Sequence, residues 1–306
     1  MRPPTLIVLR ALKIGDLVTA TPALRALARA FPLHRRVLCA PAALEPLVSL
    51  TGAVNEVVDA VPLAPLPRSL ERSAVAVNLH GRGPQSTRTL AALEPERLVT
   101  FAGAGFEGPQ WRPDEHEVRR WCRLLDDAGI PADARDLWLR RPDVEPPPIA
   151  VGATVVHPGA SSPARRWPAR RFAAVARAEL QASRRVVVTG AAEDVPLACE
   201  VAACAGLPDE AVLAGRTSLL ESAAVIAAAA RVCSNDTGVA HLATAFGTPS
   251  VVLFGPVPPS EWGPPPDRPH HRALWAGRRG DPHASTVDPG LLHITVDDVV
   301  GALATL

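Results

Sequence analysis

Short apolar runs alternate along the chain with segments in which apolar residues recur at helical spacing. The run "LIVLR" at 6–10 is followed by helically spaced apolar residues between 24 and 31, and then by "RVLCA" at 36–40 and "AVAVNL" at 74–79. Strands that alternate with helices are typical of a parallel sheet whose strands are joined by crossover helices. The first half of the chain therefore predicts a doubly wound α/β domain.

A proline-rich segment interrupts this alternation near the middle of the chain. "RRPDVEPPPIAVG" at 140–152 can continue neither a helix nor a central strand, so we expect a linker there. The alternation then resumes with "TVVHPG" at 154–159 and "RVVVTG" at 185–190. These patterns predict an N-terminal domain over 1–145, a C-terminal domain over 151–292 and a last helix within 293–306.

The composition agrees with two α/β domains and gives no support to a nucleic-acid-binding protein. With 306 residues, of which 47% are hydrophobic, the chain can bury two cores. The 32 basic residues nearly balance the 31 acidic ones, which removes the electrostatic argument for a nucleic-acid partner.

The cysteines and the apolar runs bear on where the protein works. The five cysteines form no Cys-x-x-Cys pair and no zinc-ligand pattern, so we expect reduced thiols and a cytoplasmic protein. No segment approaches the roughly 18 apolar residues of a membrane span. Peripheral contact with a membrane stays open.

Two sequence patterns match known motifs but lack the context that those motifs need. "GAGFEG" at 103–108 fits the dinucleotide-binding fingerprint, yet Pro109 and Pro113 follow where a helix must receive the pyrophosphate. Asn235, Asp236 and Thr237 form a glycosylation sequon, which has no use in a cytoplasmic chain. We assign neither function to the protein.

The segment 232–256 contains the first candidate for a binding site. An apolar strand leads to Asp236 or Thr237 as a helix cap, and Gly238 lets a ligand approach the backbone closely. The free N–H groups of the first helical turn favour a phosphate, and His241 faces the same way. The alternative is an ordinary capped helix with a hydrogen-bonded histidine.

A second candidate follows the strand at 154–156. In "HPGASSPARRWP", Ser161 and Ser162 form a small-residue loop at the carboxyl end of a strand, and Arg165 and Arg166 can grip phosphate oxygens. Two anion-binding loops in one domain indicate a diphosphate ligand. The alternative is a solvated basic turn.

The third candidate lies in the first half of the chain, where the loop "ALKIGD" at 11–16 joins a strand to a helix. Gly15 allows a tight turn, and Asp16 places a carboxylate at the carboxyl edge of the sheet. Asp16 could equally be only the N-cap of the helix.

Together, the three segments resemble glycosyltransferase family 9, whose best-known members are the ADP-heptose:lipopolysaccharide heptosyltransferases. The likeness is carried by residues 9–32, 157–176 and 234–264, in that order, and extends from about residue 5 to 302. It implies a GT-B architecture, in which two Rossmann-like domains face each other across a cleft and the last helix packs back on the N-terminal domain. The nucleotide-sugar donor would bind the second domain, and the acceptor would bind the first.

The resemblance also implies a role for individual residues. Asp16 matches the general base that deprotonates the acceptor hydroxyl for inverting attack on the anomeric carbon. Ser161, Ser162 and Arg165 match the diphosphate site, although arginine stands where the family usually has lysine, and Glu193 matches an acidic residue on the ribose. Four further positions match the donor-binding helix start, namely Asp236, Thr237, Gly238 and His241. On the acceptor side we expect Lys13, His80 and Arg82.

The implied function is an inverting glycosyltransferase that moves a sugar such as heptose from an ADP-linked donor to a nucleophile. The acceptor would be a hydroxyl or related group of a glycan, glycolipid or secondary metabolite. Metal-dependent glycosyltransferases commonly hold a cation with Asp-x-Asp, which this sequence lacks. We therefore expect no metal ion and no other cofactor, with helix N-termini, Arg165 and His241 stabilising the leaving diphosphate.

Two other functions are considered. A non-catalytic nucleotide-sugar-binding protein would have the same fold without transfer. An NAD-dependent oxidoreductase would depend on the pattern at 103–108.

Overall fold

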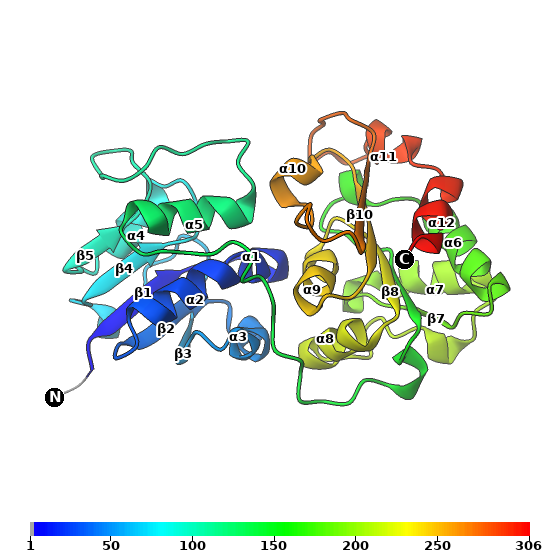
Figure 1. Cartoon of the computed structure of the whole chain (residues 1–306), viewed down its shortest axis with the longest axis horizontal. Coiled ribbons are helices and arrows are strands. Elements are labelled where there is room, and N and C mark those ends of the chain that lie inside the picture. The colour runs from blue at the N-terminus through cyan, green and yellow to red at the C-terminus, as the bar shows by residue number, and fades with distance from the viewer. Residues whose placement is uncertain (1–2) are drawn as a thin grey trace. The chain divides into compact units, whose positions relative to one another are not determined.

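The computed structural model of the chain describes residues 3–306. The chain divides into two compact units, of which the first ends at Arg140 and the second runs from Arg141 to Leu306 (Figure 1). This division lies at the beginning of the proline-rich segment 140–152.

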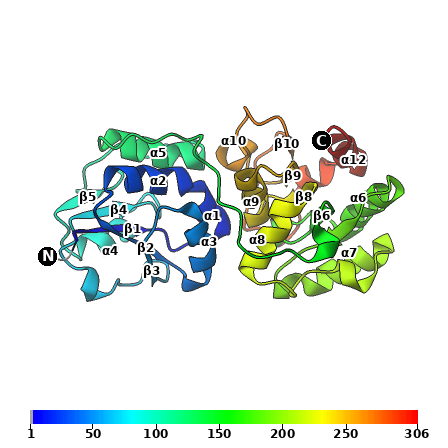
Figure 2. The same ribbon diagram turned by 60° about the horizontal axis from the view of Figure 1, so that its bottom comes forward.

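The first unit is built around a parallel sheet of five strands in the order β3-β2-β1-β4-β5. Its central strand β1 is buried, and Figure 2 shows α2 and α5 together on one side of the sheet. The strands are β1 (Thr5–Leu9), β2 (Arg35–Ala40), β3 (Glu56–Asp59), β4 (Val75–Asn78) and β5 (Arg97–Val99). The helices are α1 (Ile14–Thr19), α2 (Thr21–Ala30), α3 (Glu45–Thr51), α4 (Gln85–Ala91) and α5 (Glu117–Asp127).

The second unit repeats this plan with the strand order β10-β9-β8-β6-β7, again all parallel. Helices α6 and α7 pack against each other, as do α8 and α9. The strands are β6 (Thr154–His157), β7 (Val186–Val188), β8 (Arg231–Asn235), β9 (Ser250–Phe254) and β10 (His271–Trp275). The helices are α6 (Ala169–Gln181), α7 (Val195–Ala205), α8 (Leu219–Ala228), α9 (Gly238–Phe246), α10 (Pro259–Trp262), α11 (Pro289–His293) and α12 (Val296–Ala304). The predicted class of two doubly wound α/β domains is confirmed.

The glycine-rich pattern at 103–108 forms a tight turn closed by an antiparallel bridge between Gly103 and Phe106. The next helix, α5, begins only at Glu117. The backbone that follows the pattern therefore lacks the helix N-terminus that a dinucleotide fingerprint requires.

The last helix, α12, packs within its own unit. Thr295 caps it by accepting the N–H of Asp298, as the Thr-x-x-Asp spacing predicts. Its apolar side, with Val299 and Leu303, is buried against α6, β9 and β10. The apolar stripe of α12 thereby completes the core of the second domain. That the same helix also packs back on the N-terminal domain, as the resemblance implies, stays a prediction.

None of the helices within residues 3–306 combines the length and apolar character that crossing a membrane requires.

Replacing Leu303 by alanine should lower the free energy of unfolding of the second domain by about 2–4 kcal/mol, because the side chain is fully buried. Urea denaturation followed by circular dichroism measures the loss. The matched control is Leu292→Ala on α11, where the leucine is 39% exposed. Equal destabilisation by the two substitutions would contradict the burial of α12.

Candidate functional site

In each sheet, the strand order reverses at one point, and the loops at that point are where open α/β sheets bind ligands. In the first domain this point lies between β1 and β4, and in the second between β6 and β8. His80 and Asp236 lie in the loops that follow these strands, Asp16 lies in the first turn of α1, and Arg165 ends a short 3-10 turn. The three segments identified from the sequence thus begin at the two reversal points.

In the first domain, Arg10 holds the backbone and the side chain of Asp16. Arg10 directly follows β1 and is 1% exposed. Its Nε donates to the Asp16 carbonyl oxygen at 2.6 Å, and its Nη2 is 3.4 Å from the Asp16 carboxylate. Its Nη1 donates to the carbonyl oxygen of Leu79, which follows β4. Arg10 therefore joins the two loops at the reversal point.

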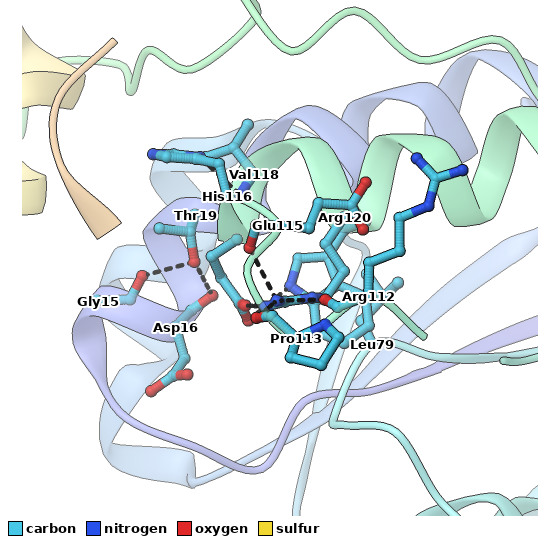
Figure 3. Close-up of polar contacts among 12 residues, drawn as sticks. Gly15, Asp16, Thr19, Leu79, Arg112, Pro113, Glu115, His116, Val118 and Arg120 are labelled. Carbon is cyan, nitrogen blue, oxygen red and sulfur yellow. Dashed lines mark hydrogen bonds and ion pairs between the residues drawn. The ribbon is translucent and has the colours of Figure 1, made fainter. Parts of the chain in front are cut away.

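The Asp16 carboxylate stays accessible although it is tethered. Its side chain is 22% exposed, and one oxygen accepts the backbone N–H of Lys13 at 3.2 Å. Thr19 donates to the carbonyl oxygens of Gly15 and Asp16, at 2.9 and 3.1 Å. In Figure 3 the Asp16 carboxylate points away from the residues around Arg120. Asp16 is thus fixed by its backbone and offers its carboxylate outward.

Glu117, at the start of α5, is the second carboxylate, after Asp16, that pairs with Arg10. It accepts from Arg10 Nη2 at 3.0 Å, from Trp121 Nε1 at 2.9 Å and from Arg120 Nη1. Burial would raise the pKa of Glu117, but Arg10 and Arg120 outweigh it and hold that pKa below its ordinary value. Glu117 is therefore an ionised buried group that fixes the Arg10 guanidinium.

Arg120 ties this cluster to the loop before α5. Its Nη2 donates to the carbonyl oxygens of Arg112, Pro113 and Glu115, at 3.1, 2.9 and 2.8 Å (Figure 3). Sequence reasoning missed Arg10, Glu117 and Arg120. The only local signal was an arginine directly after a buried strand.

The expected acceptor-side residues differ in how they lie relative to Asp16. His80 is half-buried, and its Nδ1 has no hydrogen-bond partner within residues 3–306. Burial lowers the pKa of His80 and Arg10 lowers it further, while Asp16 opposes both, so the imidazole is neutral at pH 7. Lys13 and Arg82 are exposed. The structure thus brings His80 into the electrostatic surroundings of Asp16 and Arg10.

In the second domain, the buried Asn235 holds the loop after β6. Its Nδ2 donates to the carbonyl oxygens of Pro158 at 2.8 Å and Gly159 at 3.3 Å, and its Oδ1 accepts the N–H of Trp167 at 3.1 Å. No motif in the sequence predicts this role for Asn235. It fastens the end of β8 to the loop that contains Ser161, Ser162 and Arg165.

Arg165, Asp236 and His241 lie together beside the start of α9. Arg165 Nη1 is 3.3 Å from one oxygen of Asp236, and His241 Nε2 is 4.0 Å from the other. Burial raises the pKa of Asp236 to about 6, with Arg165 partly opposing the shift. Thr237, not Asp236, caps α9 by accepting the N–H of Val239 at 3.3 Å, and Gly238 is the first helical residue. The arrangement gathers two cationic or protonatable groups at a helix N-terminus.

The remaining expected donor-side residues lie in surface turns. Ser161 is exposed, and Ser162 donates its hydroxyl to the carbonyl oxygen of Pro282 at 2.7 Å. Glu193 is exposed in a short turn before α7.

Asp194, beside Glu193, is buried and explains a glycine in the loop after β6. It accepts the N–H of Ala191 at 3.2 Å. A Cβ added at Gly159 would come within 2.4 Å of Asp194 Oδ2, so the close approach of these two loops requires glycine there. No local pattern in the sequence indicates this contact.

Within the described part of the chain, no group of three or more His, Cys, Asp or Glu side chains is placed to hold a metal ion.

Residues 110–295 match the family model described as glycosyltransferase family 9 (heptosyltransferase), and this region is more than half of the chain. The chain belongs to glycosyltransferase family 9. The family predicted from the three motifs is therefore confirmed, and the chain is a glycosyltransferase. The matched region contains both motifs of the second domain and begins after the segment with Asp16.

Two relatives illustrate the likeness in sequence. Lipopolysaccharide heptosyltransferase 2 of Escherichia coli (strain K12) is 26% identical over 300 residues, which cover 82% of each chain. Lipooligosaccharide heptosyltransferase 2 of Haemophilus influenzae is 36% identical over 114 residues, 35% of this chain and 32% of the relative.

Solved structures share the fold over nearly the whole chain. The E. coli ADP-heptose LPS heptosyltransferase II has a TM-score of 0.77 at 24% identity and 98% coverage of both chains. The glycosyltransferase family 9 protein of Veillonella parvula DSM 2008 has a TM-score of 0.78 at 19% identity, with 100% of this chain and 97% of that chain covered. At these identities the likeness establishes the fold.

The raised pKa of Asp236 predicts a pH-dependent stability of the second domain. Because that pKa is about 6 in the folded chain and 3.8 ordinarily, folding favours the protonated carboxyl. The stabilisation is fully present below about pH 4 and is lost as the pH rises through 6. The Asp236→Asn side chain stays neutral at all these pH values. The free energy of unfolding of this variant, relative to that of the wild type, should therefore be about 2 kcal/mol higher at pH 7 than at pH 4.5.

Urea denaturation at the two pH values measures this gain. Asp297→Asn, at an exposed position on α12, is the control that should show no such gain. A difference between Asp236→Asn and the wild type that is the same at both pH values would refute the assigned shift.

Proposed function

We propose that this glycosyltransferase transfers heptose from an ADP-linked donor to a hydroxyl group of a glycan or glycolipid acceptor, with inversion and without a metal ion. The named relatives support heptose and a lipopolysaccharide acceptor. The observation that carries the reaction type is the accessible Asp16 carboxylate held by Arg10 at the reversal point of the first sheet.

Asp16 is the proposed general base. Its carboxylate takes the proton of the acceptor hydroxyl while the oxygen attacks the anomeric carbon, and the bond from that carbon to the diphosphate breaks on the opposite side. Arg10 Nη2 is nearer to Glu117, at 3.0 Å, than to Asp16, at 3.4 Å. Because Glu117 shares the cation, Asp16 is oriented without being locked in a tight ion pair.

The second domain would hold the donor. The N–H groups at the start of α9, the Arg165 guanidinium and His241 supply positive charge for a diphosphate, whose charge grows as the sugar leaves. Asp236 orients Arg165. In this proposal Ser161 and Ser162 add hydroxyl contacts to the diphosphate, and Glu193 contacts the ribose.

Asp16→Asn should lower kcat by about 100-fold to 10,000-fold, because the amide cannot accept the proton. Donor affinity should stay within threefold of the wild type, since Asp16 belongs to the first domain. The measurements are ADP release from ADP-heptose with a heptose-deficient lipopolysaccharide acceptor, and calorimetric titration of the donor. Asp127→Asn, exposed on α5, is the control with unchanged kcat. An unchanged kcat in Asp16→Asn would eliminate the role.

Transfer should proceed at an unchanged rate in excess EDTA, because Arg165, His241 and the α9 N-terminus supply the positive charge in place of a cation. Initial rates with and without EDTA, on enzyme first dialysed against it, measure this. Loss of activity that Mg²⁺ or Mn²⁺ restores would refute the metal-independent mechanism.

A further inference from the structure

A hollow of about 540 Å³ opens on the first domain, away from Asp16. It is lined by the ends of α2 and α3 and by the start of β2. Crossover helices run opposite to the strands of a parallel sheet, so these ends lie at the amino edge of the sheet, whereas Asp16 follows the carboxyl end of β1. The volume is in the range of small-molecule sites.

Four arginines line the hollow, and three of them are fixed by backbone carbonyls. Arg25 Nε donates to Thr51 at 2.9 Å, Arg36 Nε to Ala53 at 2.8 Å, and Arg140 Nη2 to Ser49 at 2.5 Å. The fourth, Arg29, is 55% exposed. These bonds hold the guanidinium groups in place before any ligand arrives.

Donor groups are left over after these bonds. Among the described residues, the Nη2 groups of Arg25, Arg29 and Arg36 make no hydrogen bond to the protein, and none of the three is a buried unpaired atom. Arg29, with a side chain that is 55% exposed, offers its free donors to solvent, whereas the Arg25 side chain is only 9% exposed. Guanidinium donors of this kind bind phosphate oxygens.

The charges around the hollow do not balance. Asp136 is the carboxylate that pairs with two of these arginines, and it accepts from Arg25 Nη1 at 2.8 Å and from Arg29 Nη1 at 2.7 Å. Asp133 also lies near Arg29, but its charge is offset by its own ion pair with Arg135. The carboxyl ends of α2 and α3 add roughly half a negative charge each, which leaves an excess of about two positive charges. A phosphate ester near neutral pH carries about that charge with opposite sign.

An indole forms the apolar part of the wall. Trp138 is 51% exposed, which is unusual for so large an apolar side chain. Its ring lies 3.7 Å from the Arg25 guanidinium carbon, so the cation fixes the indole in place. A ring carried by the ligand can pack on the exposed part of the indole.

We propose that this hollow binds a sugar phosphate, with the phosphate on the arginines and the sugar ring on Trp138. Within the first domain, the hollow lies at the opposite edge of the sheet from Asp16, and the proposal does not depend on the transfer reaction.

Isothermal titration of the full chain with glucose 6-phosphate tests the site. The wild type should bind this probe at least about tenfold more tightly than Arg29→Gln and Trp138→Leu do, because each variant removes one recognition element. Arg68 lies outside the hollow, and its side chain is 93% exposed. The control variant Arg68→Gln therefore removes the same charge elsewhere on the surface and should bind the probe like the wild type. Arg29→Gln is expected to keep the melting temperature of the wild type.

The other outcomes overturn the proposal. Absence of binding, or equal binding by Arg29→Gln and the wild type, would remove the site. Inorganic phosphate binding as tightly as the ester would eliminate the role of Trp138. Binding to phosphatidylglycerol vesicles that Arg29→Gln abolishes, without binding of glucose 6-phosphate, would identify a membrane-docking surface instead. None of these results bears on ADP-heptose turnover, so the two proposals fail independently.

Discussion

The guanidinium of Arg10 is the constraint on which the first domain's site depends. A buried cation costs several kcal/mol unless it is paired and fully hydrogen-bonded. Here it is satisfied by the Asp16 backbone and carboxylate, the Leu79 carbonyl and the Glu117 carboxylate. These partners come from different elements of the fold. The hydrogen bonds that the Arg10 guanidinium makes to them therefore fix the position of Asp16, the candidate base.

In the second domain, a neutral side chain positions the loops at the reversal point. Asn235 uses both its amide group and its carbonyl to fasten the loop after β6 to the end of β8. Arg165 is thereby placed beside Asp236 and the first turn of α9. In both domains, a polar residue at the end of a central strand organises the loops that surround the reversal point.

Much of this fold could be predicted from the sequence, because alternating strands and helices limit the topology to a doubly wound sheet. Asp16, Arg165 and Thr237 could be found because a local signal, a loop after a strand and before a helix, identifies each of them. Glu117 could not be found in this way. Its partner Arg10 is 107 positions away, and nothing in the helical pattern of α5 distinguishes it from a surface acid.

The sequence distance between Arg10 and Glu117 also matters while the chain is being made. Arg10 leaves the ribosome before α5 has been synthesised, because Glu117 lies 107 positions later in the chain. Until then the growing polypeptide has a cation at the end of its central strand with its buried counter-ion still missing. Completion of this half of the enzyme is therefore tied to the emergence of its final helix, and shortened products that end before that point leave Arg10 without its buried counter-ion.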